Sequence, residues 1–276
     1  MKFDIKSTIN LSNGIEMPRF GLGVWRVEDE DILRAAIKAA LDCGYPHIDT
    51  AMIYQNEDMV GRAVEDFADR KNLFITTKLW NEDHNDAERA FELSLKKLRT
   101  DYVDLYLIHW PSPKRGNYVK AWKSLVEIYK SGRAKAIGVS NFKPAHIEKI
   151  VDATGFMPMV NQVERHPIFQ QPELAAYCRQ NGIVTQGYSP LASGRMDQFA
   201  AKIEPIALKH GKSVAQVVLR WHLQTDWVLI PKSASPSRVA ENADIFDFSL
   251  DDDDLRTIKA IDENRRLMAD ADEATF

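Results

Sequence analysis

The chain has 276 residues, of which 45% are hydrophobic and 28% are charged, and its formal net charge is −4. This composition is ordinary for a globular protein, so it excludes a fibrous or disordered chain, and the slightly acidic balance gives no reason to expect nucleic acid as a partner. The length fits one α/β-barrel domain over residues 1–276, because such barrels run to roughly 250 residues as single domains.

Nothing in the sequence predicts export, a membrane span or a metal site. The segment from Met1 to Lys6 lacks the apolar core of a signal peptide, and no stretch approaches the ~20 apolar residues of a membrane helix. No HExxH, CxxC or clustered His and Asp spacing indicates a metal. The two cysteines, Cys43 and Cys178, lie in helical patterns and are predicted to be reduced and buried. We therefore expect a cytoplasmic protein, a monomer, without membrane partners.

A hairpin opens the chain, and strands then alternate with helices. The Asn13-Gly14 pair separates two short apolar stretches between Ile9 and Met17, which predicts a β-hairpin. Eight strands follow, each a short apolar run bounded by turn residues: 20–25, 46–51, 73–79, 103–110, 135–140, 158–163, 184–189 and 227–232.

The segments between these strands have helical periodicity. Apolar residues repeat at i, i+3 and i+4 in two clear cases: Ile32, Ala35, Ala36, Ala39 and Ala40, and later Leu93, Leu95 and Leu98. Glycines, which adopt the left-handed conformation without strain, are predicted to end five helices: Gly44, Gly132, Gly155, Gly182 and Gly211. The acidic run from Asp251 to Asp254 predicts a solvated helix start.

Eight βα repeats with short connections predict a (β/α)8 (TIM) barrel whose bottom is capped by the N-terminal hairpin. An open, doubly wound sheet is the alternative. It is less favoured because Gly21-Leu22-Gly23 lacks the third glycine of the dinucleotide-binding fingerprint.

Polar residues end nearly every predicted strand, and in this fold the carboxyl ends of the strands form the reaction site. In chain order they are Asp49, Lys78, His109, Ser140, Asn141, Gln162, Tyr188 and Lys232. Each has a structural alternative, such as a buried Asp49–Lys78 ion pair or a core histidine at position 109, because structural networks also perturb pKa values. Their convergence on one rim favours a catalytic site.

Tyr54 lies five residues after Asp49, in the loop that follows the second strand. Its hydroxyl has an ordinary pKa of about 10, which a nearby cation such as Lys78 would bring closer to neutrality. A buried lysine needs a counter-charge, and Asp49 on the neighbouring strand would supply one. With His109 placed to hydrogen-bond a carbonyl oxygen, we predict that Tyr54 exchanges a proton with the substrate.

The chain resembles the aldo-keto reductase family from about residue 9 to about 262. The segments that carry the resemblance are Gly44–Ala51 with Tyr54, Asn56 and Glu57; Thr77–Trp80; Asp101–Pro111; Ile137–Phe142; Asn161–Glu164; and Ile230–Ser233 with Arg238, Glu241 and Asn242. The resemblance implies a catalytic tetrad of Asp49, Tyr54, Lys78 and His109. Tyr54 would be the general acid in carbonyl reduction and the general base in the reverse direction, with hydride supplied by C4 of a nicotinamide.

The resemblance also implies a cofactor site. Ser140, Asn141 and Gln162 would hold the carboxamide, Tyr188 would stack on the ring, and Ser189, Pro190 and Leu191 would border the pyrophosphate. Lys232, Ser233 and Arg238 resemble a site for the adenosine 2′-phosphate, with Glu241 and Asn242 on the adenine. Because a phosphate prefers Lys and Arg donors, this favours NADPH/NADP+ over NADH.

Three residues depart from the family pattern: Pro46, Met52 and Ser235. Ser235 stands where a basic residue is common near the 2′-phosphate, so one cation fewer is expected there.

The most similar subgroup is that of compact bacterial reductases of the 2,5-diketo-D-gluconate reductase type. Three features indicate it: a short loop after Trp110, the stretch Gly116–Val119 with Ala121-Trp122, and a short tail after the last helix. A short tail predicts an open, permissive site.

Trp25, Trp80 and Trp110 are predicted to line, with His109, a pocket for a small carbonyl compound, although they could merely pack the barrel top. Lys114 and Arg115 could attract the carboxylate of a keto-sugar acid, or form only a solvated loop.

The predicted function is NADPH-dependent reduction of aldehydes and ketones, with methylglyoxal or 2,5-diketo-D-gluconate as candidate substrates. One alternative is an NADPH-binding sensor subunit with little turnover. Another is a phosphate-binding barrel enzyme without redox chemistry, which would not bind NADPH.

Overall fold

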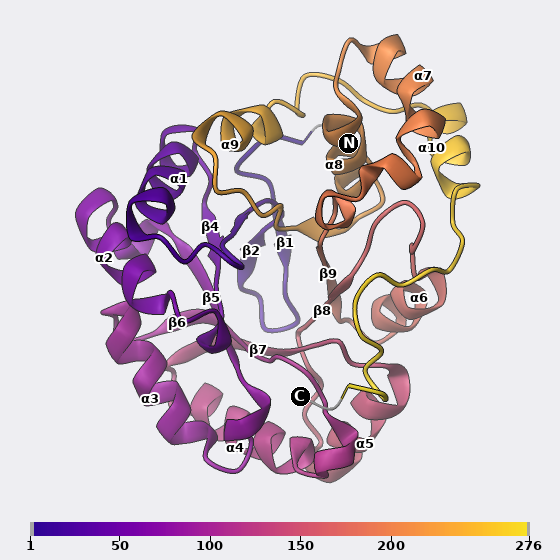
Figure 1. The fold of residues 1–276 in the computed structure, drawn as a ribbon. Helices are drawn as coiled ribbons and strands as arrows, with labels where there is room; N and C mark the ends of the chain where they lie inside the picture. The colour runs from indigo at the N-terminus through magenta and orange to yellow at the C-terminus, as the bar shows by residue number, and fades with distance from the viewer. Residues whose placement is uncertain (1–2, 275–276) are drawn as a thin grey trace.

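A computed structural model describes residues 3–274. Its main feature is an eight-stranded parallel sheet in the order β3 to β10, surrounded by helices (Figure 1). The strands are β3 (Leu22–Gly23), β4 (His47–Asp49), β5 (Phe74–Leu79), β6 (Val103–Ile108), β7 (Ala134–Ser140), β8 (Val160–Glu164), β9 (Val184–Tyr188) and β10 (Val228–Leu229). The helices are α1 (Glu30–Asp42), α2 (Glu57–Phe67), α3 (Ala87–Leu98), α4 (Tyr118–Lys130), α5 (Pro144–Thr154), α6 (Pro172–Gln180), α7 (Ala200–His210), α8 (Val214–Gln224), α9 (Pro236–Ala243) and α10 (Asp252–Lys259).

The barrel closes between its first and last strands, which confirms the predicted (β/α)8 fold. Isolated parallel bridges join Phe20 to Leu229 and Gly23 to Lys232. Strands β3 and β10 are both shorter than predicted. Pro231, just after β10, has no backbone N–H to donate to a neighbouring strand. Only its backbone oxygen takes part, accepting from Gly23 N at 3.2 Å. Glycine is required at position 23, since a Cβ there would lie 2.9 Å from the oxygen of Ile230.

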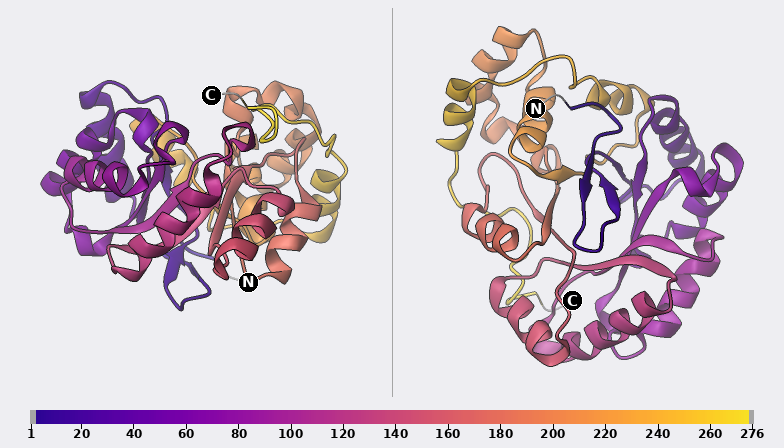
Figure 2. Two further views of the ribbon diagram at one scale, coloured as in Figure 1. Left: turned by 90° about the horizontal axis from the view of Figure 1, so that it is seen from below. Right: turned by 180° about the vertical axis from the view of Figure 1, so that it is seen from behind.

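The predicted hairpin is present and caps the bottom of the barrel. Strands β1 (Thr8–Asn10) and β2 (Glu16–Pro18) pair antiparallel. Leu11 and Met17 of the hairpin belong to one buried apolar cluster with Phe74, Val160 and other residues near the amino ends of the barrel strands. Figure 2 shows the hairpin at one end of the barrel and the end of the chain at the other. The hairpin therefore leaves the opposite end, where the strands finish, for a site.

Capping residues mark the ends of several helices. The prediction that glycines follow the ends of five helices is confirmed, and all five have a positive φ. Asp29 caps α1 by accepting from the N–H of Ile32 at 3.0 Å. Gly155 and Gly211 follow α5 and α7 in the left-handed conformation. No helix in the described range, 3–274, is both long enough and apolar enough to cross a membrane.

The apolar repeat that predicts α1 is only partly the face that the helix buries. The helix buries Leu33, Ala36, Ile37 and Ala40, whereas Ile32 is 46% exposed. The alanine-rich sequence permits two overlapping apolar stripes, and the stripe with the larger side chains, Leu33 and Ile37, is the one that packs.

Helix α3 shows the same effect. Leu93, one of the three leucines of the apolar repeat, is exposed, whereas Leu95 and Leu98 are buried. Both cysteines are free thiols, but only Cys178 is buried, and Cys43 at the end of α1 is partly exposed.

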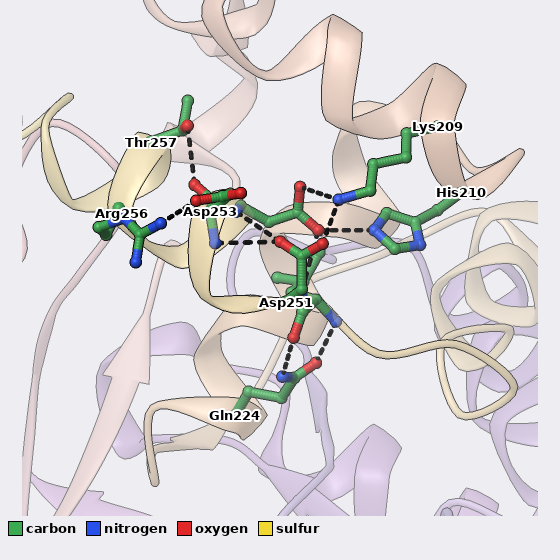
Figure 3. A network of polar contacts seen from close by, with 9 residues as sticks. Lys209, His210, Gln224, Asp251, Asp253, Arg256 and Thr257 are labelled. Atoms are coloured by element: carbon green, nitrogen blue, oxygen red, sulfur yellow. Dashed lines mark hydrogen bonds and ion pairs between the residues drawn. The ribbon is translucent and has the colours of Figure 1, made fainter.

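The acidic run at the start of α10 is not solvated throughout. Asp251 caps the helix and is exposed, but Asp254 is buried. Lys209 Nζ lies 2.9 Å from Asp254 Oδ1 and 2.5 Å from Asp251 Oδ2, and His210 Nε2 lies 2.7 Å from Asp254 Oδ2. Figure 3 shows Lys209 and His210 at the end of α7 reaching these carboxylates. This network attaches α10 to α7.

Candidate active site

Asp49 and Lys78 form a buried ion pair at the top of the barrel. Lys78 Nζ donates to Asp49 Oδ1 at 2.5 Å and to the backbone oxygen of Thr50 at 2.8 Å, and Gln162 Nε2 donates to Asp49 Oδ2 at 2.7 Å. Burial lowers the pKa of Lys78 and raises that of Asp49, and the contact between the two opposes both shifts. Because both charged groups have further hydrogen-bond partners, the charged pair is the state that this geometry supports.

Tyr54 lies beside this pair, in the short helix η1 (Met52–Tyr54) that follows β4. Lys78 Nζ is 5.2 Å from the centroid of its ring, and the ring of His109 is 5.7 Å away, edge to face. Burial raises the pKa of Tyr54 well above 10, and the negative charge of Asp49 adds to the shift. The net shift is therefore opposite to the predicted lowering, because burial of the phenol outweighs any effect of the Lys78 cation. The phenol is protonated at neutral pH.

His109 follows β6 and completes the group. Its ring is 5.3 Å from that of Trp80, edge to face, and its backbone N–H donates to the oxygen of Leu79 at 3.1 Å. Burial, with a smaller contribution from the charge of Lys78, lowers the pKa of His109 well below 6.5. The imidazole is thus neutral at physiological pH and can act as a hydrogen-bonding group without carrying charge.

The predicted tetrad residues therefore meet at one place. Asp49 ends β4, Lys78 is the last residue but one of the adjacent strand β5, and His109 directly follows the next strand, β6. Tyr54 comes from the segment that follows β4. Parallel pairing brings the carboxyl ends of neighbouring strands together, which explains how residues far apart in sequence share this rim.

A polar network from β7, β8 and β9 borders the tetrad. Asn141 Nδ2 donates to the backbone oxygen of His109 at 3.0 Å, and the hydroxyl of Tyr188 donates to Asn141 Oδ1 at 2.7 Å. Ser140 Oγ donates to the backbone oxygen of Gln162 at 2.8 Å. Asn141 has a positive φ of 64°. These four residues, predicted as the carboxamide and ring site, therefore form one connected group.

Gln162 links that group to the tetrad. Its Nε2 donates to Asp49 and also to Gln186 Oε1 at 3.0 Å. Both amide hydrogens are used in this way, so the side-chain oxygen is the atom of Gln162 that remains for a ligand. Gln186 was not predicted as a site residue, because it lies within β9 rather than at its end.

The loop after β9, predicted to border the pyrophosphate, contains Ser189, Pro190 and Leu191. Ser189 has a positive φ of 50°, and two further non-glycine residues of the loop, Ala192 and Ser193, share the left-handed conformation. Such backbone is uncommon outside glycine and concentrates at functional sites. Ser189 Oγ lies 3.0 Å from Ser193 Oγ, so the loop folds back on itself.

Three cations gather beyond this loop. Lys232 follows β10, Arg238 lies on α9, and Arg26 follows Trp25 after β3. Burial lowers the pKa of Lys232, and the charges of Arg238 and Arg26 lower it further. None of the three forms an ion pair with a carboxylate within residues 3–274. Adjacent cations without counter-ions make a site that attracts a multiply charged anion.

Arg26 was missed by sequence reasoning, although it stands at the end of a strand on the same rim. It supplies a third cation where Ser235 supplies none. Ser235 instead precedes α9 at the N-cap position, without a capping hydrogen bond from its side chain, and its N–H donates to Ser233 Oγ at 3.2 Å.

The residues predicted to contact adenine differ in exposure. Asn242 of α9 is buried, whereas Glu241 is exposed.

Two of the three predicted pocket tryptophans lie beside His109. Trp110 belongs to an apolar cluster against which Trp80 packs, and the ring of Trp80 lies edge to face with that of His109. The third, Trp25, follows β3, and the guanidinium of Arg26 lies 4.5 Å from its ring. Lys114 and Arg115 are exposed in η4 (Pro113–Arg115).

The short tail, from which an open site is predicted, packs against the aromatic cluster beside His109. Ala271 and Ala274 pack against Trp110 and are 2% and 5% exposed. Within the described residues no group of three or more His, Cys, Asp or Glu side chains could hold a metal ion.

Comparisons with known proteins identify the family of the chain. Residues 17–263 match the model of the Aldo/keto reductase family. The chain is 48% identical to methylglyoxal reductase DkgA of Escherichia coli over 269 residues, which are 97% of this chain and 98% of the relative. It is 47% identical to glyoxal reductase of Bacillus subtilis, with both chains covered completely. A solved structure of a Gox0644 mutant in complex with NADPH has a TM-score of 0.93 and 46% identity, over 98% of this chain and 99% of that one.

Proposed function

This chain belongs to the aldo/keto reductase family, and from that premise we propose that it reduces small aldehydes and ketones to alcohols with NADPH. The observation that carries the proposal is the meeting of a neutral tyrosine, a buried Lys–Asp pair and a neutral histidine at the mouth of the barrel. Tyr54, Lys78, Asp49 and His109 supply a proton donor, a cation, its counter-charge and a hydrogen-bonding group, which are the groups that carbonyl reduction requires.

The residues present fit NADPH. The uncompensated cations Arg26, Lys232 and Arg238 suit its 2′-phosphate, with Ser233 beside them, and the strained loop Ser189–Leu191 suits the pyrophosphate. Ser140, Asn141 and the oxygen of Gln162 would receive the carboxamide, and Tyr188 would pack on the ring. Glu241 and Asn242 would contact the adenine. When bound, the nicotinamide supplies hydride from C4 to the substrate carbon.

Within that complex the protein handles the proton. As the carbonyl carbon gains hydride, its oxygen becomes an alkoxide, which is more basic than a phenolate, so Tyr54 gives up its proton even though burial raises the pKa of Tyr54. The O–H bond of Tyr54 breaks and the alcohol O–H bond forms. The resulting tyrosinate is stabilised by the Lys78 ammonium, which Asp49 holds in place. Solvent then returns a proton to Tyr54.

Neutral His109 orients the substrate. Because its pKa lies well below 6.5, it does not titrate near neutrality and can hydrogen-bond a carbonyl oxygen without drawing substrate carboxylates by charge. Trp80, Trp110 and Trp25 would face the rest of the substrate, and the ring of Trp25 also contacts the guanidinium of Arg26. An aromatic wall beside a few polar groups suits a small compound such as methylglyoxal or a diketone.

The proposal includes a monomer acting in the cytoplasm. All proposed tetrad and cofactor residues come from one chain, which supports a complete site without a partner subunit. Size-exclusion chromatography with light scattering tests the oligomeric state.

Steady-state kinetics test the proposal. Purified protein should oxidise NADPH when given methylglyoxal or a diketone, and should use NADH much less well. Binding of NADPH without turnover of any carbonyl compound would indicate a sensor instead, and absence of NADPH binding would indicate a barrel enzyme of another class.

A further inference from the structure

The segment after α10 lies across the rim of the barrel beside the tetrad. It runs past α6 towards α5, where the described chain ends (Figure 1). Ala271 and Ala274 at its end are buried against Trp110, and Trp80 packs on the same cluster. Since Trp80 lies 5.3 Å from the ring of His109, a continuous line of contacts joins the tail to the tetrad. The tail is therefore a wall of the space in which a substrate would sit.

This wall has almost no structure of its own. From Arg265 to Ala274 its internal backbone hydrogen bonds run from the N–H groups of Glu273 and Ala274 to the oxygen of Asp270 and make a single turn. A segment without a helix or sheet partner keeps its position only through attachments to the rest of the protein.

The first attachment lies at the start of the tail. The buried carboxylate of Glu164, at the end of β8, accepts from the N–H of Leu267 at 2.7 Å and from the N–H of Met268 at 3.2 Å. This contact fixes where the segment enters the rim, but it leaves the part that touches Trp110 unattached.

Two further attachments hold that part. Lys114 Nζ donates to the backbone oxygen of Glu273 at 3.3 Å, and the other attachment comes from the start of α5. Lys143 Nζ donates to Asp270 Oδ1 at 2.7 Å and to Asp272 Oδ2 at 2.5 Å. His146 Nε2 lies 2.8 Å from Asp272 Oδ1. The two aspartates flank Ala271, so these contacts fix the position of Ala271 against Trp110. We call Lys143, His146, Asp270 and Asp272 the α5 clamp.

The hydrogen bonds within the α5 clamp agree with a neutral His146. The backbone N–H of Lys143 donates to His146 Nδ1 at 3.2 Å, so Nδ1 is an acceptor and Nε2 carries the hydrogen that is donated to Asp272. Burial lowers the pKa of His146, although Asp272 opposes the shift. Both ring nitrogens are thus satisfied without protonation, and Lys143 provides the positive charge of the clamp.

We propose that Lys143 and His146 are positioning residues for substrate selection: by holding Asp270 and Asp272 they keep Ala271 and Ala274 against Trp110 and so set the size of the substrate pocket. This inference rests on the proposed carbonyl reductase function. Release of the tail removes apolar contacts from a small substrate and makes room for a large one. The KM for a small dicarbonyl therefore rises, its kcat changes little because the tetrad is untouched, and bulky carbonyl compounds become better substrates.

The test compares methylglyoxal with the bulkier phenylglyoxal, using NADPH, for Lys143→Met and Asp272→Asn. The ratio of kcat/KM for methylglyoxal to that for phenylglyoxal should fall about tenfold, the size of effect expected when one pocket contact is lost. Lys143→Arg keeps a cation beside both aspartates and should stay within about twofold of the parent ratio.

Lys209→Met is the matched control. Lys209 and His210 bind Asp251 and Asp254 as Lys143 and His146 bind the tail aspartates, but they attach α10 to α7 (Figure 3). This variant loses an equivalent ion pair and should keep the substrate ratio.

Hydrogen–deuterium exchange at the backbone amides of Asp272, Glu273 and Ala274 reports the position of the clamped part of the tail without any turnover. Exchange should be faster in Lys143→Met and Asp272→Asn than in the parent or in Lys209→Met. Faster exchange with an unchanged substrate ratio would overturn the role in selection, and unchanged exchange would overturn the clamp itself. If the parent reduces no carbonyl compound, the proposed function fails, while the exchange result still decides whether the α5 clamp holds the tail.

Discussion

The three uncompensated cations lead to a specific prediction about cofactor choice. Arg238→Ala removes one guanidinium from the group that includes Arg26 and Lys232. A hydrogen bond to a charged group contributes about 1.5–3 kcal/mol, and because Arg238 is exposed on α9 the lower figure applies. That figure corresponds to a rise of about tenfold in the Kd for NADPH. NADH lacks the 2′-phosphate, so its Kd should change by less than about twofold.

The assay is titration of protein tryptophan fluorescence with each cofactor at low and high salt. Arg26→Ala should behave like Arg238→Ala, and the effect of either should shrink as salt screens the phosphate. Arg256→Ala serves as the control, since Arg256 is an exposed arginine paired with Asp253 on α10 and lies away from the proposed site. Equal losses for NADPH and NADH, or no loss for either, would refute the assignment of these cations to the 2′-phosphate.

Three further predictions follow from the site and the core. Asp49→Asn leaves Lys78 buried without a counter-charge and should lower the free energy of unfolding, measured by urea titration, by about 3–5 kcal/mol. Adding Lys78→Met to the same chain should recover part of that loss. Additive effects of the two substitutions would contradict the ion pair. Burial holds the pKa of His47 at about 3, below the ~6.5 of an unfolded chain, so its contribution to stability is complete above about pH 6.5 and is lost as the pH falls. Between pH 7 and pH 5 the contribution of His47 alone should fall by ~2 kcal/mol, to which other buried histidines such as His109 add. His47→Gln should reduce the pH dependence of the parent by about that amount rather than leave it intact. Neutralising Lys114 and Arg115 should lower kcat/KM for a keto acid several-fold more than kcat/KM for methylglyoxal at low salt, and an unchanged keto acid value would remove these residues from substrate attraction.

Much of the fold and of the tetrad could be predicted because both produce patterns within short stretches of the sequence. Each barrel strand is a short apolar run, and Asp49, Lys78 and His109 interrupt or end such runs where an apolar residue would otherwise be expected. Parallel pairing then forces those positions onto one rim, so their meeting follows from the fold once the strands are identified.

What could not be predicted depends on contacts between distant segments. The direction of the shift in the pKa of Tyr54 depends on how fully the ring is buried and on whether Asp49 already balances Lys78. The position of the tail against Trp110 depends on Asp270 and Asp272, whose partners Lys143 and His146 lie more than a hundred positions earlier in the chain. Neither pattern is visible in a local window of sequence.

The sequence did not determine which face of α1 is buried, for a different reason. Ile32 and Leu33 are adjacent and both apolar, so the periodicity fits two registers and only packing against the barrel selects Leu33. Arg26, in contrast, was available to sequence reasoning, because a cation directly after a strand-ending tryptophan satisfies the same rule that identified Lys78 and Lys232.

The most direct test of the central claim, proton donation by Tyr54, is a single-turnover measurement on Tyr54→Phe. The substitution removes only the hydroxyl and keeps the ring beside Lys78 and His109. The rate of methylglyoxal reduction should fall by ~10²–10⁴-fold while the Kd for NADPH stays within about twofold of the parent value. Reduction by Tyr54→Phe at close to the parent rate would contradict the account.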